Sequence, residues 1–207
     1  MTDKNILLVE GTDDEHVVKH LCGHYSLFID RIRDCKGVDE LLKEFPVQLK
    51  NSGIEALGVV VDADVNIQAR WESIKNHLMT AGYPDVPQTP DAQGSVIQPP
   101  VDSLLPRVGV WLMPDNQTNG ILEDFLRFLV PQPNGLLNYA QHCINRIPDG
   151  QRRFETKDET KALMHTWLAW QKEPGKPFGT AITARYLDAN IKNAGVFVDW
   201  LKRLFFS

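Results

Sequence analysis

Carboxylates stand directly after apolar, strand-like runs at three places in the chain. Glu10 ends the run in ILLVEGTDD, Asp62 and Asp64 end the run in LGVVVDAD, and Asp115 follows VGVWLMP. A carboxylate at the end of a buried strand is costly unless a positive charge lies opposite it. Such carboxylates are also the groups that act as general acids and bases and that bind hard cations such as Mg²⁺. These residues are therefore the first candidates for a functional site.

The elements that must position these acids alternate between strand-like and helix-like segments over the first 115 residues. Four strands are predicted, at 5–9, 27–32, 56–61 and 108–113. A short additional strand is suggested at 95–98. Helical spacing of apolar residues predicts helices after Gly11, after Gly37 and from Ile67 to Leu78. This alternation is typical of a parallel sheet. The fold class expected is α/β, with a four-stranded, mainly parallel, Rossmann-like sheet flanked by helices.

The second part of the chain is helical throughout. An unusually apolar helix over 120–130 carries Glu123, and further helical segments follow at 137–147, 157–171, 182–187 and 196–206. We expect residues 1–130 to form the α/β domain and residues 131–207 to form a helical extension packed on it.

The carboxyl ends of parallel strands lie at one edge of a sheet, where ligands bind in open α/β folds. The acids at the strand ends are therefore expected to converge. Two carboxylates about 4 Å apart repel by roughly 4 kcal/mol at an effective dielectric constant near 20. Protonation or a divalent cation can relieve this repulsion, and Mg²⁺ suits an all-oxygen shell.

Two other interpretations of the second acidic motif were weighed. DADVN resembles the start of a calcium loop, but Ile67 stands where that loop needs Gly and Ser73 stands where it needs Glu. The Val run leading into Asp-x-Asp also resembles the nucleophile strand of haloacid-dehalogenase-type phosphatases. In those phosphatases the residue four positions after the first Asp is usually Thr or Val, whereas this chain has Asn66. Their motif also usually lies on the first strand. We therefore prefer a metal site to this interpretation.

The composition excludes several classes of protein. The chain has 207 residues, a formal net charge of -5 and three cysteines without CxxC spacing, which argues against a disulfide framework and a zinc knuckle. Neither a membrane span nor a signal peptide is expected, so the cytoplasm is the predicted compartment. The negative charge disfavours broad electrostatic binding of nucleic acid and leaves a local basic patch as the alternative.

A strand ending in Glu-Gly, a later strand ending in Asp-x-Asp, and strands interleaved with helices resemble the Toprim domain of topoisomerases, primases and overcoming-lysogenization-defect type nucleases. The resemblance covers roughly residues 4–130. The spacing of Glu10 and Asp14 in VEGTDD is similar to the E-G-x-x-D form of the nuclease branch, and Asp62 and Asp64 match its Asp-x-Asp pair. The chain most resembles a compact, uncharacterised Toprim family with an added helical tail.

The resemblance implies Mg²⁺- or Mn²⁺-dependent cleavage or transfer of phosphodiesters in DNA or RNA. It implies that the metal ligands are Glu10, Asp14, Asp62, Asp64 and Glu123. It also implies that Glu10 acts in general acid/base catalysis and that a Lys after the core stabilises developing charge. Lys161 is the best positional match for that Lys, with Lys157 as its rival. A nucleic-acid backbone is expected to contact a basic patch that contains Arg146, Arg152, Arg153 and Lys157.

The chain departs from the family pattern in ways that matter. No ATPase P-loop motif is present, so any motor would be a separate protein partner, and neither a strand-passing Tyr nor a primase zinc module is recognisable. A homodimer is left open, because the aromatic stretch from Phe197 to Phe205 is expected to be core or subunit interface. The alternative function is a non-catalytic Toprim-like module that binds a nucleotide, nucleic acid or a partner protein.

Three histidines, His16, His20 and His24, recur every fourth residue along the first predicted helix and so share one face. They lack a further ligand in the sequence, and we expect surface histidines there.

Overall fold

The computed structural model describes residues 3–148 and 150–206. Its centre is a five-stranded sheet in the order β2-β1-β3-β5-β4. The strands are β1 (Asn5–Val9), β2 (Arg31–Asp34), β3 (Ala56–Asp62), β4 (Ser95–Ile97) and β5 (Arg107–Met113). All neighbours are parallel except β4, which pairs antiparallel with β5. The α/β class with a mostly parallel sheet is confirmed. The sheet has five strands instead of the expected four, because the short strand suggested at 95–98 joins it as β4.

The second strand begins later than its sequence predicts. Residues 27–30 connect α1 to β2, because the Leu27 amide donates to the Cys22 carbonyl and Ser26 has a left-handed φ of 54°. Asp30 then accepts hydrogen bonds from the backbone amides of Lys4 and Asn5, both 2.9 Å long. The apolar residues Leu27 and Ile29 thus pack beneath a turn. The sequence pattern alone does not distinguish such a turn from a strand, because both can contain a run of apolar residues.

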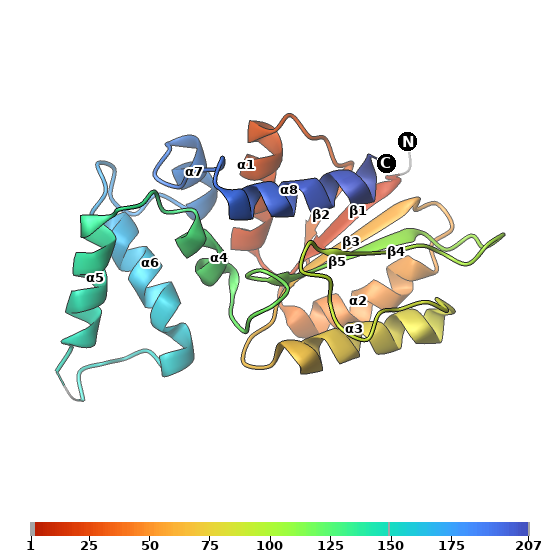
Figure 1. Ribbon diagram of the computed structural model, residues 1–207, viewed down its shortest axis with the longest axis horizontal. Helices are drawn as coiled ribbons and strands as arrows, with labels where there is room; N and C mark the ends of the chain where they lie inside the picture. The colour runs from red at the N-terminus through yellow and green to blue at the C-terminus, as the bar shows by residue number, and fades with distance from the viewer. Residues whose placement is uncertain (1–2, 149, 207) are drawn as a thin grey trace.

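Helices cover both faces of the sheet (Figure 1). One face packs against α1 (Thr12–His24) and α8 (Lys192–Phe205), and the other packs against α2 (Val38–Leu49) and α3 (Ile67–Ala81). Successive residues of β1 point to opposite faces, so Leu7 and Val9 enter one hydrophobic cluster while Ile6 and Leu8 enter the other. The sheet is therefore buried on both faces, as parallel sheets usually are.

The remaining helices extend from the carboxyl end of the sheet (Figure 1). They are α4 (Leu122–Phe128), α5 (Gly135–Asn145), α6 (Glu159–Ala169) and α7 (Phe178–Thr183), with a 3₁₀ turn over Thr156–Asp158. Helices α5 and α6 form an antiparallel hairpin, and α4 packs between α6 and the sheet. Helix α4 is where the chain leaves the sheet, and it brings Glu123 to the carboxyl edge.

Helix α8 is the last element of the chain and lies directly on the sheet. A Cβ atom at Gly109 of β5 would lie 2.4 Å from Leu204 Cδ2, so only glycine leaves room for this helix. The Trp200 indole donates to the Ser95 carbonyl of β4 and packs 5.6 Å from the Trp111 ring. The aromatic stretch of α8 is core, while the division into domains at residue 130 stays a prediction.

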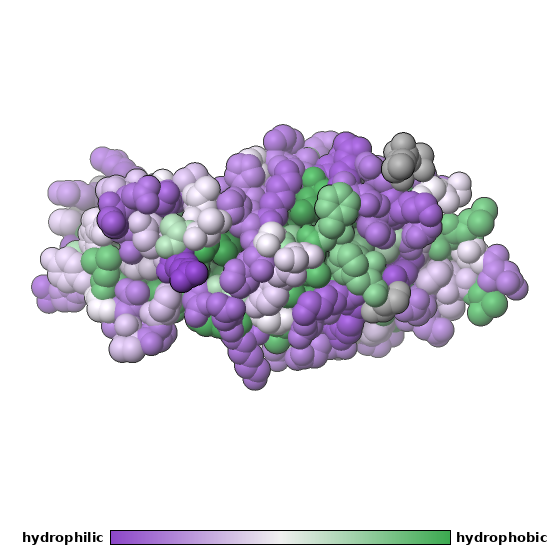
Figure 2. Space-filling model, turned by 90° about the horizontal axis from the view of Figure 1, so that it is seen from above, coloured by the Kyte–Doolittle hydropathy of each residue, from purple (hydrophilic) through white to green (hydrophobic). Residues whose placement is uncertain are grey.

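The surface seen from above is mixed and mostly hydrophilic (Figure 2). Hydrophobic residues gather near the middle of this face, and smaller groups lie at the end farthest from α5 and α6 (Figure 2). The connection between β4 and β5 exposes Val101 and Leu104. Among the described helices, none has both the length and the apolar composition that a membrane span requires.

Candidate functional site

The first acidic motif and the Asp-x-Asp motif meet at the carboxyl edge of the sheet. Strands β1 and β3 are adjacent, with Val9 opposite Val60, so the residues that follow them emerge side by side. Glu10 Oε2 accepts a hydrogen bond of 3.2 Å from the backbone amide of Asp62. The expected convergence of Glu10 and Asp62 is therefore confirmed.

Asp14 lies in the first turn of α1, directly behind Glu10. Its Oδ2 accepts from the Gly11 amide at 3.1 Å and closes the helix start, as a carboxylate three residues after the cap often does. The residue is only 6% exposed, and its other oxygen, Oδ1, has no hydrogen-bond partner among the described residues. Burial, and then the charge of Glu10, raise the pKa of Asp14 to about 7.

Asp62 is the centre of the cluster. Its Oδ1 accepts from the Leu122 amide at 2.9 Å and so connects β3 to the start of α4. Burial raises the pKa of Asp62 to about 9, and the charges of Asp14, Glu10 and Glu123 add to this effect. Burial also raises the pKa of Glu10, against a lowering by the Asp62 amide. These shifts are the electrostatic signature of carboxylates that repel one another in a poorly solvated place.

Glu123 and Lys161 complete this side of the site. Glu123 lies in the first turn of α4 with a side chain only 5% exposed, and Lys161 Nζ of α6 lies 3.6 Å from its Oε1. Lys161 therefore contacts the acidic cluster, and its role in stabilising developing charge stays a prediction. Lys157 lies farther out and pairs with Glu155 at 3.3 Å.

Asp64 is placed differently from the other four predicted ligands. It has a left-handed φ of 52°, its side chain is 48% exposed, and its Oδ2 forms an ion pair with Arg70 of α3. The Arg70 Nε also donates to the Asp62 carbonyl at 2.9 Å. One guanidinium thus fixes both ends of the Asp-x-Asp motif.

The loop that carries Asp64 is also tied to the loop before α4. Asp64 and Gly120 exchange two backbone hydrogen bonds of 2.9 Å, one in each direction. The Asn119 side chain donates to the Val65 carbonyl at 2.8 Å and accepts from the Ile67 amide at 2.9 Å. These hydrogen bonds hold the Asp-x-Asp loop against the loop that leads to Glu123.

Arg70 and Asn119 were missed by sequence reasoning. Arg70 follows Asp64 by six residues and lies in the first turn of a predicted helix. A cation at that position could have indicated an ion pair with the Asp-x-Asp motif. Asn119 carried no signal, since its role depends on two loops that are far apart in the chain.

Asp115 does not join the cluster. Its Oδ1 accepts from the Gln117 amide, the Thr118 amide and the Thr118 hydroxyl, at 2.8 to 3.0 Å. The carboxylate therefore stabilises the turn after β5, which is the commoner use of an Asp in that position.

Two clefts, of about 470 and 300 Å³, open on either side of the cluster. Asp62, Glu123 and Lys161 line both of them. Asp64 and Lys157 line the larger cleft, while Glu10 and Asp14 line the smaller one. A substrate bound in either cleft would meet carboxylates on one side and Lys161 on the other.

The cations of the expected basic patch lie among acidic side chains. Arg152 pairs with Glu159 at 3.1 Å and lies 5.0 Å from the Phe154 ring centre, and Lys157 pairs with Glu155. Arg153 is exposed. The patch is thus interleaved with acids, because the same turn of chain that carries the cations also carries Glu155 and Glu159.

The side chains present fit a hard divalent cation in their chemistry. All the converging groups are carboxylates, and the buried Asp14 Oδ1 has no protein partner. Within residues 3–148 and 150–206, however, no three His, Cys, Asp or Glu side chains are arranged so that they could hold a metal ion as they stand. The carboxylates would have to draw together around a cation.

The fold and the site define an α/β protein with a carboxylate cluster at the carboxyl edge of a mostly parallel sheet. The chain belongs to the DUF3226 family, whose description is "protein of unknown function", and the family model matches residues 4–206. No curated protein and no solved structure matches the chain significantly.

Proposed function

We propose that the protein is a Mg²⁺- or Mn²⁺-dependent phosphodiesterase of the Toprim type that acts on nucleic acid. One observation carries the proposal: Glu10 of the loop after β1, Asp14 of α1 and Glu123 of α4 come together around Asp62 of β3. Folding would avoid such a concentration of like charge unless a cation or a proton compensated for it.

The proposed metal ligands are these four carboxylates and Asp64. A cation bound by them would neutralise their repulsion and polarise a phosphodiester. Asp14 offers its unpartnered Oδ1, and Asp64 becomes available when Arg70 releases its carboxylate.

The remaining roles fall to groups around the clefts. Glu10 would accept or donate a proton at the reacting oxygen, since burial raises its pKa. Lys161 would stabilise negative charge on the phosphate, because its Nζ lies 3.6 Å from Glu123 Oε1 at the edge of both clefts. Lys157, Arg152 and Arg153 would contact the nucleic-acid backbone beyond the larger cleft.

The test compares the wild type with an Asp62→Ala/Asp64→Ala double variant on plasmid, single-stranded DNA and RNA. We expect cleavage that needs Mg²⁺ or Mn²⁺ and that the double variant lacks. An Asp85→Ala/Asp199→Ala variant removes the same charge from exposed positions and should keep the activity. Cleavage that survives in the Asp62→Ala/Asp64→Ala variant would overturn the assignment of the site.

A second candidate is a non-catalytic module that binds a nucleotide, nucleic acid or a partner such as a separate ATPase. The observation that favours it is that Arg70 already neutralises Asp64 and Lys161 already contacts Glu123. Thermal stabilisation by Mn²⁺ without any cleavage would support the module over the enzyme.

A further inference from the structure

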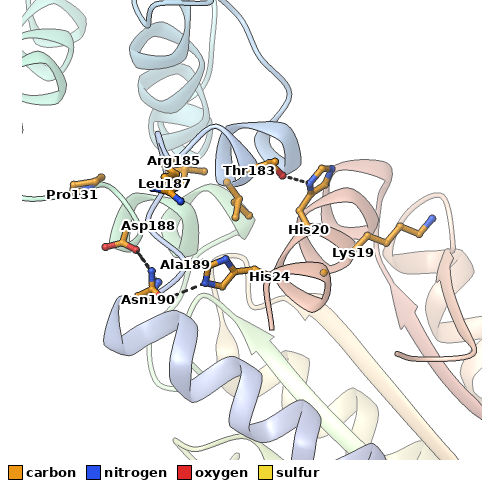
Figure 3. A pocket seen from close by; sticks show the side chains of 12 residues that line it. Lys19, His20, His24, Pro131, Thr183, Arg185, Leu187, Asp188, Ala189 and Asn190 are labelled. Carbon is orange, nitrogen blue, oxygen red and sulfur yellow. Dashed lines mark hydrogen bonds between the residues drawn. The ribbon is translucent and has the colours of Figure 1, made fainter. Parts of the chain in front are cut away.

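A separate groove lies away from the acidic cluster, between the second half of α1 and the segment that joins α7 to α8. Its volume is about 810 Å³, larger than either cleft at the acidic site, and it falls in the range of small-molecule pockets. Figure 3 shows His20 and His24 reaching from α1 toward that segment, while Lys19 turns away from it. The groove is thus formed by two parts of the chain that are about 160 residues apart.

Two histidines are held in fixed orientations on one wall. His20 Nδ1 lies 2.7 Å from the Thr183 hydroxyl, and His24 Nε2 lies 3.2 Å from Asn190 Oδ1 (Figure 3). When Thr183 donates to Nδ1, the second nitrogen of His20 carries a proton and can donate to an anion. When His24 donates from Nε2, its neutral ring keeps Nδ1 as an acceptor for a hydroxyl group.

The opposite wall carries one cation and one acid. Arg185 is exposed, with a left-handed φ of 60°, and its guanidinium has no partner among the described residues. Non-glycine residues seldom adopt this conformation, and they do so more often at ligand sites. Asp188 uses Oδ1 for both hydrogen bonds from Asn190, which leaves Oδ2 as an acceptor (Figure 3).

The floor between the walls is apolar. Ile182, Leu187 and Ala189 are buried beneath the groove, and Pro131 closes one side. The lining therefore combines donors suited to an anion, acceptors suited to hydroxyls, and an apolar surface of pocket size.

We propose that this groove binds a nucleoside monophosphate. Arg185 and His20 would contact the phosphate, since a guanidinium matches phosphate oxygens in charge and geometry. His24 and Asp188 would accept hydrogen bonds from the ribose hydroxyls, and the base would lie on the apolar floor. This binding site is independent of the proposed nuclease chemistry.

The test measures binding of AMP by isothermal titration calorimetry in EDTA, where the metal-free acidic clefts repel phosphate. We expect a Kd on the order of 10–100 µM for AMP and weaker binding of ribose 5-phosphate, adenosine and inorganic phosphate. Arg185→Gly should weaken AMP binding at least about tenfold and leave adenosine binding unchanged. Glycine accepts the left-handed φ at this position, so the variant keeps its fold.

Arg31→Ala is the matched control, because Arg31 is an exposed arginine at the start of β2, outside the groove, and AMP binding should not change. The absence of AMP binding at millimolar concentration, or equal AMP binding by Arg185→Gly and the wild type, would overturn the proposal. Equal affinity for AMP and ribose 5-phosphate would show that the base does not bind to the apolar floor, and would overturn that part of the proposal.

Discussion

At the residue scale, the chain places ionisable groups where burial and like charge oppose their ionisation. Asp14 and Asp62 are protonated more readily in the folded protein than in the unfolded chain, because burial and neighbouring carboxylates raise the pKa of each. A site that binds cations has this property in the metal-free state, since protons occupy it in the absence of metal. The sign of the effect leads to a measurable dependence of stability on pH.

In EDTA, the free energy of unfolding should fall as the pH rises from about 4 to about 9. Each raised pKa means that the native state binds more protons than the unfolded state over that interval, so stability falls by up to about 1.4 kcal/mol per pH unit for each proton. The interval runs from the ordinary value near 3.8 to about 7 for Asp14 and about 9 for Asp62. Urea unfolding at a series of pH values measures this slope.

The Asp62→Asn variant isolates the contribution of the cluster. The amide cannot ionise, so the variant should be more stable than the wild type at pH 9 and should show a flatter slope. Other titrating groups cancel in the difference between the two proteins. A wild type that is as stable at pH 9 as at pH 5, with Asp62→Asn showing the same profile, would contradict the prediction.

Arg70 is expected to stabilise the metal-free site and to compete with a cation for Asp64. Arg70→Ala removes the hydrogen bond to the Asp62 carbonyl and the ion pair with Asp64, and should cost about 1–3 kcal/mol of stability in EDTA. The same variant should gain a larger increase in melting temperature from Mn²⁺, because Asp64 is no longer paired. Arg31→Ala, at an exposed ion pair, should change neither quantity appreciably. A smaller Mn²⁺ effect in Arg70→Ala would show that Arg70 organises the ligands instead of competing for them.

At the element scale, the contact between α8 and the sheet depends on glycines. Gly58 and Gly109 lie on β3 and β5, where Leu204 of α8 comes closest to the backbone. The absence of a side chain lets the helix approach, and Leu204, Trp200 and Phe197 then fill the space. Such a close approach is a common reason for glycine inside a strand.

Gly109→Ala should destabilise the protein by about 1–3 kcal/mol, because the new methyl group forces Leu204 to move in a well-packed core. Gly195→Ala is a matched control in α8 itself, where a Cβ would meet nothing within 4 Å. That control should be stabilised by about 0.5–1 kcal/mol, since alanine favours the helix. Chemical denaturation of both variants measures the two effects, and equal stability of Gly109→Ala and the wild type would show that the helix can shift without cost.

At the scale of the whole molecule, the last helix is part of the hydrophobic core on one face of the sheet. Seven residues of α8 are buried, among them Phe197, Trp200, Leu201 and Leu204. Burying one large apolar side chain contributes about 1.5–3 kcal/mol, so α8 contributes an amount comparable to the 5–15 kcal/mol net stability typical of a domain. We therefore expect the sheet to depend on α8 for its stability.

A chain that ends after Asn190 should fail to unfold cooperatively in urea, since it exposes Trp111 and the face of the sheet that α8 covers. A fragment of residues 1–130 should behave in the same way. Circular dichroism and tryptophan fluorescence during urea titration measure this. Cooperative unfolding of either fragment would support the division at residue 130 as a boundary between autonomous domains.

The amino-acid sequence alone determined the α/β class and the approach of Glu10 to Asp62. Both follow from local rules: apolar runs of strand length alternating with helical spacing predict a parallel sheet, and parallel strands end at one edge. The helix start at Thr12 also followed from the sequence, and it is what turns Asp14 inward beside Glu10.

Tertiary structure alone decided which charges remain free. Asp115 closes a turn, Asp64 pairs with Arg70, and the cations near Arg152 pair with acids of their own loop. It also decided that β4 joins the sheet and that α8 covers it. These features depend on contacts between residues far apart in the chain, or on which of several local partners a side chain chooses. Residue type and spacing determine the order of the elements along the chain. They do not determine how the elements pack or which partner a side chain binds.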